Sequence, residues 1–107
     1  MFARNVAFSL KPNSVPEFTR KFETEVLPLL QKQSGFRDEF ILLGDDNIHV
    51  HAISLWESRE HAEAYDKKTY PQVLETLAEI VMGTPKVRIS NVVSSTVSMT
   101  TAGATAA

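Results

Sequence analysis

The chain has 107 residues, a formal net charge of −2 and no cysteine. This length suits one domain built around a single hydrophobic core. The missing cysteines exclude disulfides, thiolate metal sites and cysteine nucleophiles. Basic residues are interleaved with acidic ones and form no patch or stripe, which argues against a nucleic-acid partner.

The chain also lacks the hydrophobic segments that target or anchor proteins to membranes. No apolar stretch approaches the ~18 residues that a membrane-spanning helix needs, so we expect no membrane partner. Residues 1–6 show no basic segment followed by an apolar one, as a secretory signal would. A cytoplasmic protein is therefore expected.

The first third of the chain predicts a strand followed by an interrupted helix. Apolar residues alternate over residues 2–10, which is the period of a β-strand. Ser14 and Glu17 then form a capping-box pattern at the start of a helix, and an apolar stripe continues to about residue 30. Pro28 removes a backbone donor and clashes one turn back, so we expect a kink or break at residues 24–27. Gly35 ends the helix.

The middle of the chain predicts a β-hairpin. Residues 36–43 and 48–56 are two extended apolar runs. The linker Gly44-Asp45-Asp46-Asn47 joins them and is rich in residues that tolerate unusual backbone angles. Two neighbouring antiparallel strands are therefore expected here.

The last part predicts two helical segments and a fourth strand. Ser58 is a helix cap for residues 59–67, and Thr69 with Gln72 repeats the capping-box pattern before residues 70–82. Gly83 followed by Pro85 is a stop signal for that helix. Alternation over residues 86–97 then predicts the strand.

The order β-α-β-β-α-β predicts an α+β fold, a ferredoxin-like four-stranded antiparallel sheet with helices on one face. Both sides of its strands are apolar, since Phe36, Phe40 and Leu42 alternate with Ile41 and Leu43. Helices can cover only one set, and the other set would be an exposed patch of a size that monomers avoid. We therefore expect two sheets to pack face to face in a homodimer.

The domain is expected to span residues 1–97. Residues 98–107 carry no charge and only small or flexible side chains. Such a composition predicts a disordered tail, unless a partner subunit holds it in place.

Two histidines are the leading catalytic candidates. His49 and His51 share one face of a strand because side chains repeat every two residues, and imidazole titrates near neutral pH. The pair suits a general base, a metal site that would need at least a third ligand, or structural hydrogen bonds.

Asn5 is the third catalytic candidate. It lies on the strand face made of Ala3, Asn5, Ala7 and Ser9. If this face looks toward the helices, its small side chains leave room for a pocket, and the amide would hold a substrate oxygen or a developing oxyanion. If the opposite face looks toward the helices, Asn5 lies in the dimer interface.

Three aromatic residues are candidates for substrate binding. Trp56 ends a strand and favours a core position over stacking on a substrate. Tyr65 and Tyr70 would each offer a phenol to a bound aromatic, or pack against the sheet. By contrast, Arg4, Arg37 and Arg88 are interpreted as salt-bridge partners of acidic residues on the sheet, rather than as an anion site.

Several of these segments together resemble the antibiotic biosynthesis monooxygenase family. They are Pro12 after the first strand, Ser34-Gly35-Phe36, and Leu55-Trp56-Glu57-Ser58-Arg59-Glu60-His61-Ala62. The resemblance covers residues 2–97 and implies a dimeric α+β barrel. It also implies cofactor-independent oxidation of a small electron-rich aromatic, a quinol or phenol, by molecular oxygen.

On this interpretation His49 or His51 is the base, Asn5 and Tyr65 are polar contacts, and no flavin, metal or haem takes part. The haem-degrading branch of the family uses an Asn on the first strand, a Trp in the helix after the Trp-Glu-Ser motif and a His ten residues later. These positions here hold Asn5, Tyr65 and Glu75. Because the imidazole that ligates iron is missing, haem degradation is not expected.

Two other classes of function stay open. The scaffold also suits a non-catalytic barrel that binds a small apolar ligand, or an isomerase or lyase, since fold does not fix function.

Overall fold

The computed structural model describes residues 1–96. Four strands form one antiparallel sheet in the order β2-β3-β1-β4. The strands are β1 Phe2–Leu10, β2 Phe36–Leu43, β3 His49–Trp56 and β4 Val81–Asn91. The helices are α1 Val15–Lys21, the π-helical turn η1 Phe22–Val26, α2 Leu27–Gln31, α3 Arg59–Lys68 and α4 Tyr70–Leu77.

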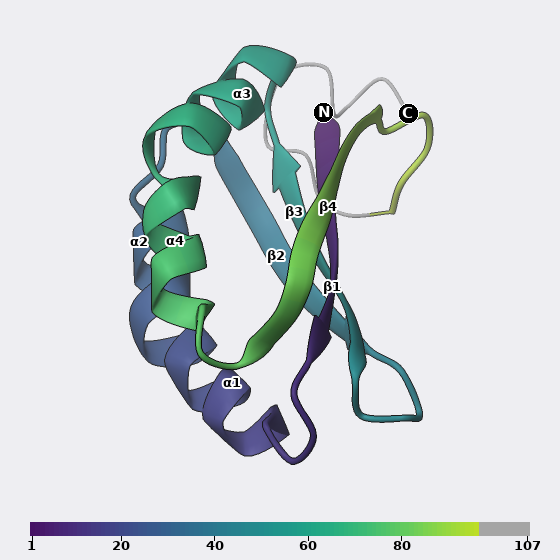
Figure 1. The fold of residues 1–107 in the computed structure, drawn as a ribbon. Coiled ribbons are helices and arrows are strands. Elements are labelled where there is room, and N and C mark those ends of the chain that lie inside the picture. Colours follow the sequence, from purple (N-terminus) through teal and green to yellow (C-terminus); the bar gives the residue numbers. More distant parts are fainter. Residues whose placement is uncertain (97–107) are drawn as a thin grey trace.

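The helices all lie against the same face of the sheet (Figure 1). This arrangement and the strand order confirm the predicted ferredoxin-like α+β fold. No helix within residues 1–96 is long and apolar enough to cross a membrane.

The core lies between the sheet and the helices, with Trp56 near its centre. Trp56 is fully buried, and its ring centroid lies 5.5 Å from that of Phe36 and 5.1 Å from that of Tyr65. Its indole N–H donates to the Ser54 hydroxyl at 2.8 Å, so its one polar atom is satisfied. The prediction that Trp56 packs in the core is confirmed.

The predicted break in the first helix is a π-helical turn. The backbone N–H of Leu27 donates to the carbonyl of Phe22, five residues back, directly before Pro28, which has no N–H to offer. The buried side chains Phe22, Val26 and Leu30 are spaced by four residues, slightly more than one α-helical turn. The wider turn counters the resulting drift and keeps the three on one side.

The start of β4 differs from the prediction. The strand begins at Val81, and helix α4 ends at Leu77, so Gly83 and Pro85 lie inside the strand rather than after the helix. They lie where the pairing of β1 with β4 shifts register. Proline is tolerated there because β4 is an edge strand with a bulge. The tail prediction for residues 98–107 falls outside the described residues.

Of the three predicted helix caps, one is confirmed and two are wrong. Ser58 caps α3 by accepting a hydrogen bond from the N–H of His61 at 3.3 Å. The Ser14 side chain makes no cap hydrogen bond to α1, and the Thr69 hydroxyl donates to the Gln33 side chain instead of capping α4.

The face of the sheet that no helix covers has an apolar half and a polar half. A register shift at the start of β2 turns Phe36 toward Trp56, which corrects its predicted place beside Phe40 and Leu42. The apolar half lies on β2 and β3; Phe40 and Leu42 are 44% and 50% exposed. The polar half lies on β1, β3 and β4 and carries Asn5, His49, His51, Lys86 and Arg88.

Candidate active site

A cavity of about 240 Å³ lies between the sheet and the helices. Most of its wall is apolar and comes from β1, η1, α2, α4 and β4, with Val6, Phe22 and Leu77 as examples. Five polar residues complete the lining, namely Arg4, Glu39, Ser54, Tyr65 and Tyr70. An apolar pocket with a few convergent polar groups is typical of a small-molecule site.

Three of these polar residues form one row across the sheet. Arg4 on β1 pairs with Ser54 on β3, and Ser54 pairs with Glu39 on β2. Since neighbouring strands lie ~4.8 Å apart, Arg4 and Glu39 flank Ser54 on the helix-facing side. The row therefore places a cation and a carboxyl group on one wall of the cavity.

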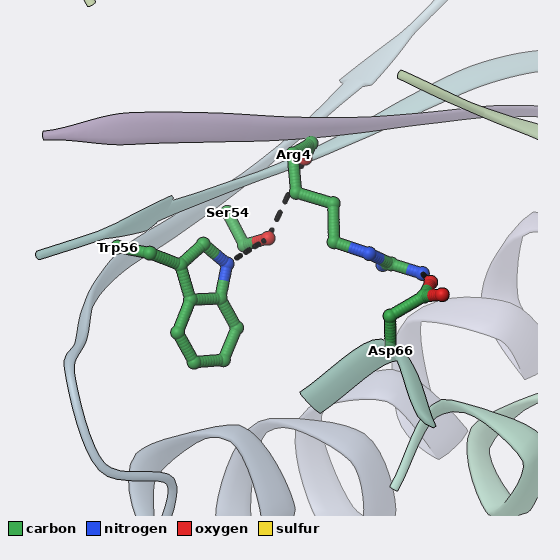
Figure 2. Close-up of polar contacts among 4 residues, drawn as sticks. All are labelled: Arg4, Ser54, Trp56 and Asp66. Atoms are coloured by element: carbon green, nitrogen blue, oxygen red, sulfur yellow. Dashed lines mark hydrogen bonds and ion pairs between the residues drawn. The ribbon is translucent and has the colours of Figure 1, made fainter. Parts of the chain in front are cut away.

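Arg4 is the best-buried charge of this row, at 2% exposure. Its guanidinium donates to Asp66 on α3 at 2.6 Å, and Figure 2 shows the side chain reaching from the sheet to that helix. The charge also lies 4.1 Å from the ring centroid of Tyr70 and 5.1 Å from that of Tyr65. A buried cation needs such partners, because removing its charge from water costs free energy that only close contacts with an anion or an aromatic ring offset.

One donor of Arg4 is left over. Its Nε is buried and has no hydrogen-bond partner among residues 1–96. Buried donors of this kind are rare and call for a partner. The group can therefore strengthen its hydrogen bonding when an oxygen-bearing ligand enters.

Burial raises the pKa of Glu39 to about 8, although the nearby Arg4 charge works against this rise. A carboxyl group with such a pKa exchanges its proton near neutral pH, which is what a general acid or base requires. Burial also raises the pKa values of Tyr65 and Tyr70. Both phenols therefore stay protonated, so each hydroxyl keeps a proton to donate.

Of the three predicted substrate-binding residues, two line the cavity and one does not. Tyr65 and Tyr70 line the cavity, with ring centroids 6.2 Å apart. Trp56 packs behind Tyr65 in the core and supports that ring without lining the cavity.

The predicted catalytic residues lie on the opposite face of the sheet. His51 Nδ1 is 3.1 Å from the side-chain oxygen of Asn5, and His49 Nδ1 is 2.5 Å from Asp46 in the hairpin turn. The helix-facing orientation considered for Asn5 is therefore corrected. Arg4, Val6 and Leu10 face the helices instead, because that side of β1 carries the large apolar residues.

Arg4 and Glu39 are the site residues that the sequence interpretation missed. Arg4 was interpreted as a salt-bridge partner of acidic residues on the sheet, and Glu39 as one of those acidic residues. A signal was available at Arg4, which alternates in phase with Val6, Phe8 and Leu10, so a charge was present on an otherwise apolar strand face. Within residues 1–96, no three histidine, aspartate or glutamate side chains gather as a metal site would require.

The comparisons with known proteins agree with this fold. A family model described as antibiotic biosynthesis monooxygenase matches residues 1–79. No curated protein matches the sequence. Many solved structures do.

Three of the solved structures illustrate the likeness. A monooxygenase from the gene ActVA-Orf6 of Streptomyces coelicolor, in complex with nanaomycin D, is 18% identical, with 88% of each chain covered and a TM-score of 0.74. SnoaB, a cofactor-independent oxygenase from Streptomyces nogalater, is 15% identical over 90% of this chain and 96% of its own, with a TM-score of 0.72. A protein of unknown function from Nitrosomonas europaea is 15% identical over 90% and 92%, with a TM-score of 0.74.

At these identities the structures establish the shared fold, whereas the family model covers most of the sequence itself. The chain belongs to the antibiotic biosynthesis monooxygenase family.

Proposed function

We propose that this protein is a monooxygenase that oxidises a small electron-rich aromatic, a quinol or phenol, with molecular oxygen and no cofactor. The observation that carries the proposal is the apolar cavity with Arg4 and Glu39 on one wall. A dry cavity of about 150 Å³ binds benzene, so a volume of about 240 Å³ admits a larger ring system. Family membership and the printed description of SnoaB as a cofactor-independent oxygenase also support it.

The residues of the cavity suit each step of such a reaction. The Glu39 carboxylate takes the phenolic proton, and the Arg4 guanidinium stabilises the resulting oxyanion. Oxygen then forms a C–O bond at an activated ring carbon, and the hydroperoxide loses water. The balance is phenol plus O₂ to quinone plus water, so no external reductant is needed. Tyr65 and Tyr70 would orient the ring.

The apolar walls serve the same chemistry by keeping water away. In a water-poor site the attraction between the oxyanion and Arg4 is stronger than in solution. The raised pKa of Glu39 brings the base closer to the pKa of a phenol, which is ~10, so proton transfer is less uphill.

Oxygen uptake with a panel of hydroquinones and anthrones tests the proposal. We expect turnover by the wild-type protein and a loss of about 10²–10⁴-fold in Glu39→Gln. Glu75→Gln, at an exposed position of α4, is the matched control and should retain activity. No turnover above background would refute the monooxygenase, and binding without turnover would favour the ligand-binding alternative.

The histidine proposal is tested in the same assay. In the double variant His49→Ala, His51→Ala we expect turnover with these small substrates to persist, because both rings lie outside the cavity. Asn5→Ala should behave alike. If the histidine variant loses turnover while Glu39→Gln retains it, the base is a histidine and the assignment of Glu39 is wrong.

We also propose a homodimer formed through the apolar half of the open sheet face. Phe40 on β2 pairs with Ile53 on β3, and Leu42 lies two residues further along the same face of β2. Together they make a self-complementary patch that would be covered in a symmetric pair.

A further inference from the structure

A second hollow of about 320 Å³ lies on the open face of the sheet, between β1, β3 and β4. Half of its ten lining residues are polar, namely Ser9, His49, His51, Thr84 and Lys86. Its wall shares two residues with the wall of the cavity, Phe8 and Gly83. The two hollows are therefore neighbours on either side of one short stretch of backbone.

That stretch is the bulge of β4. Ala7 pairs with Lys86 and Ser9 pairs with Met82, so three residues of β4, namely 83 to 85, lie opposite Phe8 alone. Gly83 has a φ of +69°, and a Cβ added there would meet nothing within 4 Å. Glycine inside a strand often marks a place where a ligand approaches the backbone closely, and bulges occur preferentially beside active sites.

The mouth of the cavity is at the same place. Leu74 on α4 and Ala78, directly after that helix, line the cavity and are exposed, as is Gly83 on β4. In Figure 1 the chain runs from the end of α4 directly into this part of β4, at the edge of the sheet. A ligand that leaves the cavity by this mouth therefore meets bare backbone at Gly83, with the second hollow beyond it.

The second hollow offers positive charge. Lys86 forms no ion pair within residues 1–96, and Arg88 lies on the same face of β4, two residues further along. The His51 ring is held by Asn5 at 3.1 Å, which fixes its direction. Asp46, the acidic residue closest in sequence to His49 and His51, is already paired with the His49 ring.

We propose that the cavity and the second hollow form one binding groove over Gly83. The substrate is then a two-part molecule. Its electron-rich ring fills the cavity, and an anionic tail, such as a carboxylate, crosses Gly83 to Lys86 and His51. This inference rests on the proposed function of the cavity and extends it to a substrate class. It also gives His51 a binding role instead of a catalytic one.

Binding of three matched probes, measured calorimetrically without oxygen so that no turnover occurs, tests the groove. The probes are a naphthol, the same naphthol with a carboxamide on a three-carbon tether, and the same tethered compound with a carboxylate. In wild-type protein at low salt we expect the carboxylate to bind about fivefold more tightly than the amide, as one exposed ion pair allows. This preference should shrink at high salt.

The variants locate the effect. Lys86→Gln should abolish the preference for the carboxylate, whereas Lys67→Gln on the exposed side of α3 should keep it. Gly83→Asn, which tolerates a positive φ, should weaken both tethered probes by a larger factor than it weakens the naphthol, because the added side chain lies in the path of the tether.

Equal affinities of the carboxylate and amide probes in wild-type protein would overturn the groove, as would a preference that survives Lys86→Gln. In either case, binding of the naphthol alone would leave the proposed function of the cavity intact. If the naphthol itself does not bind, both proposals fail.

Discussion

Glu39 determines how stability should depend on pH at the scale of a single residue. Its pKa rises from 4.5 to about 8 on folding, so the folded state holds this proton more tightly than the unfolded state does. The contribution of Glu39 to stability is therefore fully present below pH 4.5 and is lost as the pH rises through 8.

The expected result is a wild-type melting temperature that falls between these pH values more steeply than that of Glu39→Gln. Thermal unfolding in a series of buffers measures this difference. Asp46, whose pKa is lowered to about 2 by hydrogen bonds from the His49 and Ile48 backbone, titrates outside this window and does not obscure the comparison. Parallel pH profiles for wild type and Glu39→Gln would contradict the burial of Glu39.

Gly35 joins two segments that are far apart in the sequence. Its φ is +79°, and an added Cβ would lie 2.2 Å from the ring of His61. The His61 ring, in turn, is 2.7 Å from the Ser58 hydroxyl, and the Gly35 carbonyl accepts a hydrogen bond from Glu57 at 2.8 Å. The Ser-Gly-Phe and Trp-Glu-Ser segments are therefore in direct contact. His61 is half-buried here.

Gly35→Ala should lower the free energy of unfolding by about 2–4 kcal/mol, from backbone strain together with the clash. Gly83→Ala is the matched control, because it has the same kind of φ but no neighbour within 4 Å. It should lose only the strain, about 1–2 kcal/mol. Urea unfolding measures both. Equal losses in the two variants would show that contact with His61 carries no cost.

Helix α3 provides a prediction at the scale of an element. Ser58 accepts the hydrogen bond that caps this helix, so Ser58→Ala should cost about 1 kcal/mol and Ser58→Asp should cost little. Ser14→Ala is the control, since the Ser14 side chain makes no cap hydrogen bond. Chemical denaturation of the three variants is the measurement. A loss in Ser14→Ala as large as that in Ser58→Ala would contradict the difference between the two caps.

The elements also show what the sequence could and could not predict. β1 and β2 have the predicted bounds, and the break before Pro28 was predictable because proline removes a specific hydrogen bond. β4 was predicted to start five residues late. Gly83 and Pro85 carry the same local signal at a helix end and in a bulged edge strand, and only pairing with β1 distinguishes the two.

The candidate site could not be predicted from any single element, because its residues come together only when the strands pair. Alternation divides β1 into two faces, but it does not say which face meets the helices. Both orientations of Asn5 therefore stayed open, and Arg4 was interpreted as a salt-bridge partner rather than as a site residue. The row Arg4-Ser54-Glu39 depends on the register of three strands, which local pattern does not determine.

At the scale of the whole molecule, the distribution of residues on the open face predicts how two copies meet. The apolar half on β2 and β3 has Phe40 and Leu42 at 44% and 50% exposure, whereas the β1–β4 half has Asn5, Lys86 and Arg88. Burying the charged half would cost desolvation energy without hydrophobic gain. The contact should therefore centre on β2 and the neighbouring part of β3, and leave the β4 side of the second hollow, beside Gly83, accessible.

Sedimentation at micromolar concentration tests this arrangement. Wild-type protein should sediment at twice the chain mass of 11.9 kDa, and Leu42→Lys should sediment as a monomer, because it places a charge in the apolar contact. Leu74→Lys is the matched control, since Leu74 is 38% exposed but lies on α4, away from the open face. It should remain dimeric. Wild-type protein that stays monomeric would refute the pairing, and a dimeric Leu42→Lys would place the contact elsewhere.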